Sequence, residues 1–207
     1  MDQEKPPPPE SSTESSSASS RQRILAAALK LFVEQGYFNT NVPDLSKLSR
    51  CSVGSIYHTF KNKEEIAASL YQESIVAFRM ALTRSIEKSA EPEQVIKSLV
   101  TSFMTFAEVN HQLSRYIWLC RHAEFLDKIS SHPTSVGFDQ LGRKLTKTIR
   151  TGEKSGVMRT LPAQILWSVI FGIPLAYVRD WLDGFNKVSP IHVSETIADS
   201  VWRALKA

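Results

Sequence analysis

The sequence predicts an all-α protein of about nine helices, with a small N-terminal unit of three helices followed by a larger helical bundle. Its 207 residues include only 8 glycines, and the apolar residues recur at spacings of three and four, the period of an α-helix. Proline or a capping residue stands at the start of most of these stretches, and glycine follows several of their ends. No stretch predicts a strand.

The composition is that of an ordinary soluble globular chain, with 42 % hydrophobic and 22 % charged residues. The net charge of +4 is unevenly spread. Residues 1–20 carry one cationic and four acidic side chains, whereas residues 21–63 carry seven cationic and two acidic ones. A basic segment of this kind indicates contact with a phosphate backbone, and a solvated basic face is the alternative.

Residues 1–20 contain four consecutive prolines and a serine-rich run with almost nothing to bury, which predicts a disordered tail. They lack the apolar segment of a signal peptide, and the longest apolar run, Ile165 to Val178, is too short to span a bilayer. The sequence therefore predicts a cytoplasmic protein with no membrane partner, whose two cysteines stay reduced.

Three helices are expected in the basic segment, over residues 20–36, 40–48 and 52–60, and a long fourth one over residues 63–88. Small polar residues stand where the second and third helices begin, as N-caps do. Gly36 follows the first helix and can end it in a left-handed conformation.

The third helix is the most informative of these elements. Ile56 and Phe60 lie four residues apart and face inward, which leaves the other faces to small and polar side chains. A short helix with a small leading end can enter the DNA major groove and bring its side chains to base edges. We therefore expect a recognition helix, with contacts drawn from Ser52, Val53, Gly54, Ser55 and His58.

Five further residues are candidates for phosphate contacts. Tyr57 can rest its ring on protein and point its hydroxyl at a phosphate, and a core tyrosine is the alternative. The start of the second helix, at Thr40 and Asn41, presents free N–H groups and the positive end of the helix dipole. Lys61 and Lys63 flank the same surface, although Lys63 can also be a solvated lysine at a helix start.

The contiguous stretch from Gly36 to Ile66 resembles the signature of the TetR/AcrR family of transcriptional regulators. The matching positions are Gly36-Tyr37, Thr40-Asn41-Val42, Leu45 and the run Ser52-Val53-Gly54-Ser55-Ile56-Tyr57-His58-Thr59-Phe60-Lys61-Asn62-Lys63-Glu64-Glu65-Ile66. The resemblance implies a helix-turn-helix that binds operator DNA. It also implies Tyr57 and Lys63 on phosphates, Thr40 at the phosphate site of the second helix, and recognition contacts from Ser52, Val53, Ser55 and His58.

Two positions of the turn, and one of the recognition helix, depart from the family pattern. The turn glycine common in the family is Arg50 here, and Cys51 follows it. Arg50 must take a turn geometry that suits glycine better, and its charge adds a candidate phosphate contact. Cys51 is expected to fill the core of the turn, and a redox switch is the alternative. The basic residue that the family has before Gly54 is Val53 here, which suits contact with a thymine methyl group.

The remaining residues predict a helical bundle with helices at about 92–109, 111–127, 134–155, 162–183 and 190–206. The helix at 162–183 is apolar nearly all round, and a bundle at the end of the chain cannot cover every side of it. A partner subunit is therefore expected, with Gly172 and Ala176 allowing close approach. The last helix offers a second apolar stripe to a two-fold homodimer, consisting of Val193, Ile197, Val201 and Leu205.

The bundle is rich in aromatic residues with a few polar groups among them, which suits a ligand pocket as well as ordinary core packing. The candidate ligand-binding residues are Phe103, Phe106, His111, Trp118, His122, Trp167, Phe171 and Tyr177. His111 and His122 share a helix face with Arg115 between them. Such a set can meet a carboxylate or a metal, and a surface pair is the alternative.

These features predict a tail over residues 1–20, a helix-turn-helix DNA-binding domain over 21–66, and a ligand-binding and dimerisation domain over 67–207. The expected function is a transcriptional regulator, in the first place a repressor, that binds a palindromic operator and is released by a small-molecule effector. An activator, or a DNA-binding regulator without a ligand response, is the alternative. The expected partners are double-stranded operator DNA, a second copy of the chain and a small lipophilic effector. No cofactor or metal is expected, and the absence of nucleophile, Walker and metal motifs argues against an enzyme.

Overall fold

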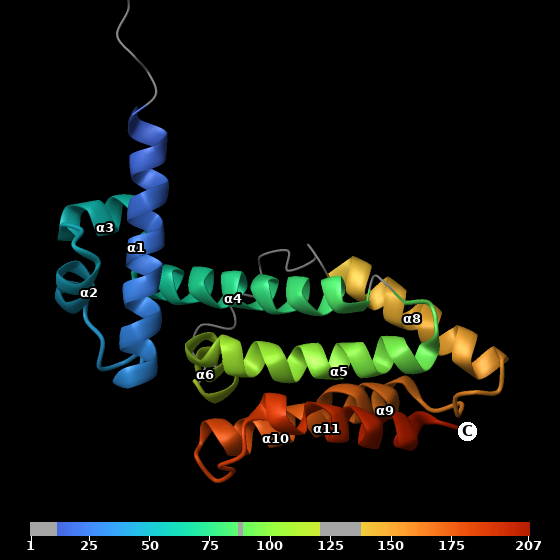
Figure 1. The fold of residues 1–207 in the computed structure, drawn as a ribbon. Coiled ribbons are helices and arrows are strands. Elements are labelled where there is room, and N and C mark those ends of the chain that lie inside the picture. The colour runs from blue at the N-terminus through green and yellow to red at the C-terminus, as the bar shows by residue number, and fades with distance from the viewer. Residues whose placement is uncertain (1–11, 87–88, 121–137) are drawn as a thin grey trace, which may run out of the picture. The chain divides into compact units, whose positions relative to one another are not determined.

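The computed structural model describes residues 12–86, 89–120 and 138–207, and within these ranges the chain is helical and contains no strand (Figure 1). This confirms the all-α prediction. The elements in chain order are α1 Ser12–Glu34, α2 Val42–Ser49, α3 Val53–Thr59, α4 Lys63–Ile86, α5 Pro92–Val109, α6 His111–Leu119, α8 Phe138–Lys154, α9 Ala163–Trp167, η1 Ser168–Gly172, α10 Ile173–Leu182 and α11 Pro190–Leu205.

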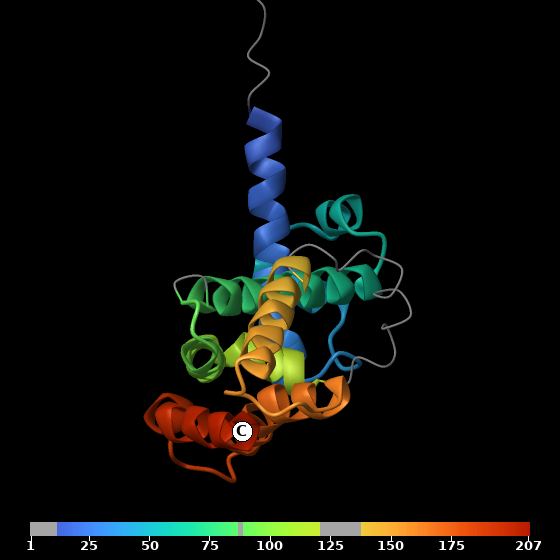
Figure 2. The same cartoon turned by 90° about the vertical axis from the view of Figure 1, so that its right-hand side faces the viewer.

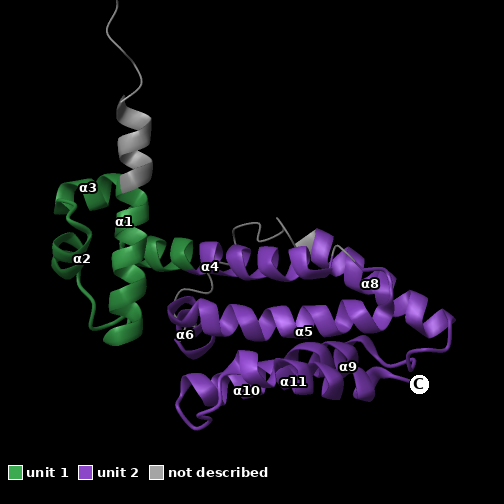
Figure 3. Ribbon diagram, in the orientation of Figure 1, with its two compact units in different colours: residues 1–70 green, residues 71–207 purple. Residues whose placement is uncertain are grey.

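The chain divides into two compact units, residues 1–70 and 71–207 (Figure 3). Helices α1 to α3 belong to the first unit and α5 to α11 to the second. Helix α4 begins in the first unit and ends in the second, so it is the covalent connection between them. The predicted domain boundary after residue 66 also falls inside this helix.

Helix α1 begins earlier than the sequence predicts. Residues 12–20 were expected to belong to the disordered tail, but they form the first turns of α1, which starts at Ser12. Adding residues to an existing helix forms one hydrogen bond for each residue fixed, so an extension avoids the cost of nucleation. The remainder of the predicted tail, residues 1–11, lies outside the described residues.

The first unit is held together by the apolar stripe of α1, which packs on α2 and α3. Ile24 and Phe32 of α1 are almost completely buried, as are Leu45 of α2 and Ile56 of α3. Phe60, directly after α3, is buried as well, as its spacing from Ile56 predicts. The unit therefore orients α3 with its apolar side inward and its opposite side toward solvent.

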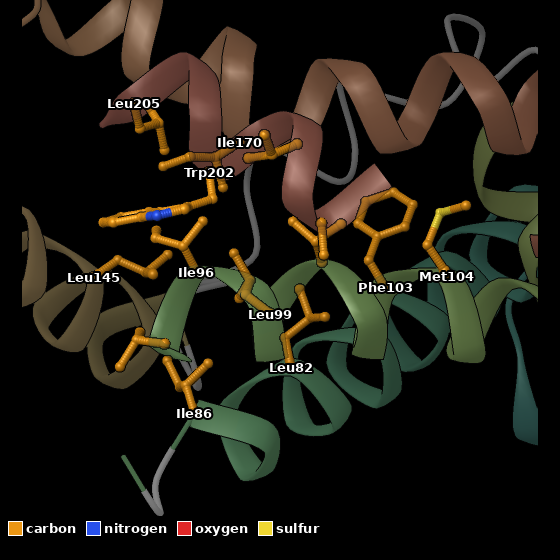
Figure 4. Close-up of a cluster of buried hydrophobic side chains, with 14 of the residues drawn as sticks. Leu82, Ile86, Ile96, Leu99, Phe103, Met104, Leu145, Ile170, Trp202 and Leu205 are labelled. Atoms are coloured by element: carbon orange, nitrogen blue, oxygen red, sulfur yellow. The ribbon is translucent and has the colours of Figure 1, made fainter. Parts of the chain in front are cut away.

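Helix α5 forms the centre of the second unit. In both views it lies between the later part of α4 and the layer that contains α10 and α11 (Figures 1 and 2). Its buried side chains, among them Ile96, Leu99 and Phe103, contribute to one hydrophobic core with Leu82 of α4 and Trp202 of α11 (Figure 4). Burial on several sides makes α5 the framework on which the other helices are positioned.

The predicted helix at 162–183 is present as three consecutive segments, α9, η1 and α10. The middle segment is a π-helix that ends just before Pro174. Proline has no N–H to donate to the carbonyl of Ile170, and its ring crowds that carbonyl, so the helix cannot stay regular there. Widening by a π-turn accommodates the proline without ending the helix.

Within one subunit, this helix is buried on one face only. Leu166, Ile170 and Val178 point into the core, whereas Gly172 and Ala176 are exposed. By length and composition, Ala163–Leu182 is the one helix among the described residues that would pass as a membrane span, and only 28 % of that window is buried. The unit therefore presents an apolar face to its surroundings.

The apolar stripe predicted for the dimer on the last helix is mostly used within the subunit. Val201 and Leu205 are fully buried where α11 packs along α5, and only Val193 and Ile197 stay partly exposed. The assignment of Val201 and Leu205 to a partner is wrong, because periodicity shows that a face is apolar without showing which helix covers it.

Candidate DNA interface and ligand cavity

Helix α2 begins at a capped N-terminus. The side chain of Asn41 accepts a hydrogen bond from the N–H of Asp44 at 2.9 Å, and Pro43 occupies the first turn, where its missing N–H costs nothing. Thr40, predicted to lie at a phosphate site, is buried instead. Its hydroxyl donates to the carbonyl of Gly36 at 2.9 Å and accepts from Gln35 at 3.3 Å. Thr40 thus fixes the turn before α2, whereas Asn41 is exposed.

Lys63 also acts within the protein. Its ammonium donates to the carbonyls of Tyr37 at 2.9 Å and Thr40 at 2.8 Å, and lies 4.3 Å from the centre of the Tyr37 ring. Two of its three N–H donors are therefore engaged in holding the turn between α1 and α2. Only the third N–H group of the Lys63 ammonium remains for the predicted contact with a phosphate. The sequence analysis did not predict that Tyr37 contacts Lys63 through its carbonyl and its ring. The position of Tyr37 directly after Gly36, in the turn between α1 and α2, was the available signal.

Helix α3 presents its small leading end to solvent. Ser52 caps the helix by accepting from the N–H of Ser55 at 3.1 Å. Val53 is 42 % exposed and Tyr57 is 53 % exposed, so neither side chain belongs to the core. The other predicted contact residues of this region are exposed apart from the half-buried Ser55; these are Ser52, Gly54, His58 and Lys61.

Gly54 is not required by the fold. Its φ does not lie in the left-handed region, and a Cβ atom added there would meet only the Oγ of Ser52, at the ordinary contact distance of 3.9 Å. Glycine inside a helix costs roughly 1 kcal/mol relative to alanine. The missing side chain at Gly54 therefore leaves the leading end of α3 open to solvent.

The turn between α2 and α3 contains the strained residue that its sequence predicts. Arg50 has φ 56° and is the only residue other than glycine with positive φ among those described. Cys51 is buried, as expected of a turn-core residue. Its Sγ accepts from the guanidinium of Arg23 at 3.5 Å, and its carbonyl accepts from the hydroxyl of Ser46 at 2.7 Å.

Replacing Arg50 by glycine is expected to raise the free energy of unfolding of the first unit by up to about 1 kcal/mol. The left-handed conformation costs roughly 1–2 kcal/mol for a residue with Cβ, and the greater chain entropy of glycine offsets part of that gain. Arg50→Ala keeps the strain and should show no such gain. If Arg50 contacts a phosphate, both variants flatten the dependence of log K for DNA on log salt by about 0.9 for each subunit bound. Urea unfolding and DNA titration at several salt concentrations measure the two effects.

The second unit contains an apolar cavity of about 250 Å³. Most of its wall is aliphatic or aromatic, and the residues that form it include Ile75, Phe78, Leu82, Leu145, Trp167 and Phe171. Two of the predicted ligand-binding residues, Trp167 and Phe171, thus lie at the cavity, with their rings stacked at 5.5 Å. The chemistry of this wall suits a lipophilic molecule.

Among the described residues that line the cavity, Arg79 is the one with a charged side chain. Its guanidinium is partly buried, and this burial lowers its pKa, an effect that Tyr71 partly opposes. Burial in turn raises the pKa of Tyr71, while Arg79 lowers it. A partly desolvated guanidinium beside an apolar cavity can bind an acidic group of a ligand more strongly than a solvated one.

Three further predicted ligand residues lie behind the cavity wall and do not line it. Phe78 makes edge contacts with Phe103 at 5.0 Å, with Phe106 at 5.2 Å and with Trp118 at 5.4 Å. Phe103 and Trp118 are also stacked on each other at 5.0 Å. These three side chains therefore support Phe78, whose ring forms part of the wall.

The polar candidates are not brought together at the cavity. His111 is largely exposed and makes an edge contact with Trp181. The partial burial of its ring and, to a smaller extent, the charge of Arg115 lower its pKa. Tyr177 donates its hydroxyl to the carbonyl of Val188 at 3.0 Å. His122 lies outside the described residues. The part of the chain that is described contains no group of three His, Cys, Asp or Glu able to hold a metal.

Comparisons with known proteins agree with this arrangement. Residues 24–70 match the family model described as bacterial regulatory proteins, tetR family. The fatty acid metabolism regulator protein of Bacillus subtilis is 24 % identical over 179 residues, which is 86 % of this chain and 91 % of that protein.

Solved structures show the same fold over nearly the whole chain. A TetR family regulator from Marinobacter aquaeolei VT8 has a TM-score of 0.74 at 17 % identity and covers 94 % of this chain and 99 % of its own. The regulator FadR from Bacillus subtilis, solved in complex with stearoyl-CoA, has a TM-score of 0.73 at 23 % identity, with coverages of 87 % and 96 %. The match to the tetR family thus lies in the helix-turn-helix region, residues 24–70, and the chain as a whole has the fold of solved TetR family regulators.

Proposed function

We propose that this protein is a ligand-responsive repressor that binds a palindromic operator as a homodimer and is released from DNA by a lipophilic effector. The DNA-binding part of the proposal is supported by the arrangement of side chains on helix α3. The helix buries Ile56 and exposes Val53, Gly54, Tyr57 and His58, and its N-terminus is capped and formed by small residues. This is the arrangement that a recognition helix needs in order to enter a major groove.

The dimer part of the proposal rests on the exposed face of α9, η1 and α10. Ile165 is 48 % exposed, and Gly172 and Ala176 lie exposed further along the same helix. A two-fold axis beside this face would bring two copies of the same apolar surface together. The small residues would let the two helices approach closely.

The effector part rests on the cavity in the second unit. A wall formed by Phe78, Trp167 and Phe171 favours an apolar molecule, and Arg79 offers a positive charge to an acidic group on it. The similar Bacillus subtilis regulator was solved with stearoyl-CoA, which supports a lipophilic effector for this chain as well.

Helix α4 is the element through which the effector would act. Its first residue, Lys63, holds the turn before α2, and Ile75, Phe78 and Leu82 further along it line the cavity. An effector that prefers a different position of α4 would change the spacing of the two recognition helices in a dimer. A coupling of about 1–3 kcal/mol changes DNA affinity roughly 5–150-fold.

The test is footprinting of the full chain on DNA flanking its own gene, followed by titration of the protected site. An inverted repeat should be protected, and affinity should fall steeply with salt. Tyr57→Phe is expected to weaken binding similarly on all sequences. His58→Ala should change preference at particular base pairs, by about 1–3 kcal/mol. Protection without two-fold symmetry would contradict the dimeric operator, and a uniform effect of His58→Ala would contradict base readout by that residue.

A further inference from the structure

The side chains of α3 include none of those that read purines with two hydrogen bonds. Helix α3 contains no arginine, lysine, asparagine or glutamine. These are the residue types that make bidentate contacts with guanine or adenine in a major groove. Direct readout of bases by α3 is therefore limited to single hydrogen bonds and apolar contacts.

Val53 is the apolar side chain at the leading end of this helix. It is 42 % exposed, so the core of the first unit does not cover it. Gly54, next to it, has no side chain, and an added Cβ atom would meet only the Oγ of Ser52. Ser52 caps the helix by accepting from the N–H of Ser55. Among these four leading residues, Val53 alone presents an apolar side chain to solvent.

The position of Val53 along α3 favours contact with bases over contact with phosphates. The N-terminal residues of a recognition helix are the ones that reach base edges. Tyr57, which we propose to contact a phosphate, lies four residues further on along the same flank, a rise of about 6 Å. The side chain of valine is short, so it reaches a base only where the helix backbone comes close. The missing side chain at Gly54 leaves room for that approach.

We infer that Val53 contacts the C5-methyl group of a thymine, and that each half of the operator has a thymine at this place. This inference rests on the proposed function, because it assigns a base preference to the same DNA interface. The methyl group of thymine is the apolar group that base pairs present in the major groove. Burying one such group against Val53 contributes about fourfold to the affinity of each half-site.

The experiment removes this methyl group from the DNA and the valine side chain from the protein. Duplexes that bind the full chain are selected from a random pool, and each thymine of the selected half-site is replaced in turn by uracil. Uracil lacks only the methyl group and keeps every hydrogen-bonding group of thymine. Each duplex is titrated with the unaltered protein and with Val53→Ala, which should fold because alanine is the better helix former.

At one thymine of the half-site, uracil should weaken binding of the unaltered protein by about fourfold, and by about fifteenfold when both half-sites are changed. Val53→Ala should bind the thymine and uracil duplexes within about twofold of each other at that place. If a C·G pair replaces the T·A pair there, 5-methylcytosine should bind the unaltered protein about fourfold more tightly than cytosine, because it restores the methyl group.

Val109→Ala is the matched control. Val109 is also an exposed valine in a helix, the last residue of α5, and it belongs to the second unit. This variant should show the same loss of affinity with uracil as the unaltered protein.

The remaining outcomes contradict the inference in different ways. A uracil effect that persists in Val53→Ala would assign the methyl readout to another residue or to DNA shape. An equal loss of affinity for Val53→Ala on every duplex would place Val53 on the DNA backbone. A selected site at which no uracil weakens binding would overturn the methyl contact and leave the operator-binding function standing. If no sequence is selected from the pool, the proposed operator binding fails together with this inference.

Discussion

Replacing Gly172 by arginine is expected to convert the proposed dimer into folded monomers and to weaken binding to a palindromic operator by about 10²–10⁴-fold. Gly172 is exposed on η1, and a Cβ atom added there meets no heavy atom within 4 Å in its own subunit. A side chain at this position is therefore tolerated by the monomer. In a two-fold interface the new charge would be buried and would face its own copy.

Gly142→Arg is the matched control for oligomeric state. Gly142 is also a helical glycine whose added Cβ would meet no heavy atom within 4 Å among the described residues, and it lies on α8, which is not one of the helices of the proposed dimer face. Sedimentation equilibrium should show monomers for Gly172→Arg and dimers for Gly142→Arg. Circular dichroism should show unchanged helix content in both. A dimeric Gly172→Arg protein would place the interface elsewhere.

Replacing Phe103 by alanine is expected to lower the free energy of unfolding of the second unit by about 3–5 kcal/mol. Phe103 is only 3 % exposed, and its ring packs against Trp118 and Phe78. The substitution would leave a cavity that the neighbouring rings of Phe78 and Trp118 cannot easily fill. All four tryptophans of the chain lie in residues 71–207, so urea unfolding followed by tryptophan fluorescence reports on this unit alone.

Phe171→Ala is the matched variant, and we expect it to affect effector binding more than stability. Phe171 is half-buried in the cavity wall, so its loss enlarges a space that already exists. We expect a smaller loss of stability and an effector affinity reduced by about 10–100-fold, because an apolar contact worth about 1.5–3 kcal/mol is removed. If Phe103→Ala instead kept full stability and lost effector binding, the aromatic cluster behind Phe78 would have to be reassigned to the ligand site.

The local features of the helix-turn-helix were predictable because they depend on neighbours in sequence. Asn41 and Ser52 cap helices by bonding to an N–H three residues further on, and the spacing of Ile56 and Phe60 fixes which side of α3 faces inward. Arg50 was likewise expected to be strained from its place in the turn. Such interactions need only the chain on either side of the residue.

The roles of Lys63 and Thr40 were not predictable in this way. A lysine at a helix start next to a basic surface is typical of a phosphate contact, but the Lys63 ammonium reaches back 26 residues to the carbonyl of Tyr37. Thr40 is buried by the same turn. A long and flexible side chain takes the partner that the fold brings within reach, and that partner is not adjacent in sequence.

The sequence by itself predicted the all-α fold class, the helix-turn-helix with the inward side of α3, and the apolar bundle of the second unit. Only the tertiary structure decided how the apolar faces were divided. It placed the stripe of α11 against α5, left one face of α9 to α10 exposed, and separated Trp167 and Phe171 at the cavity from Phe103 and Trp118 behind it. The physical reason is that hydrophobic attraction has no direction, so periodicity identifies which residues leave water and packing decides which neighbours they meet.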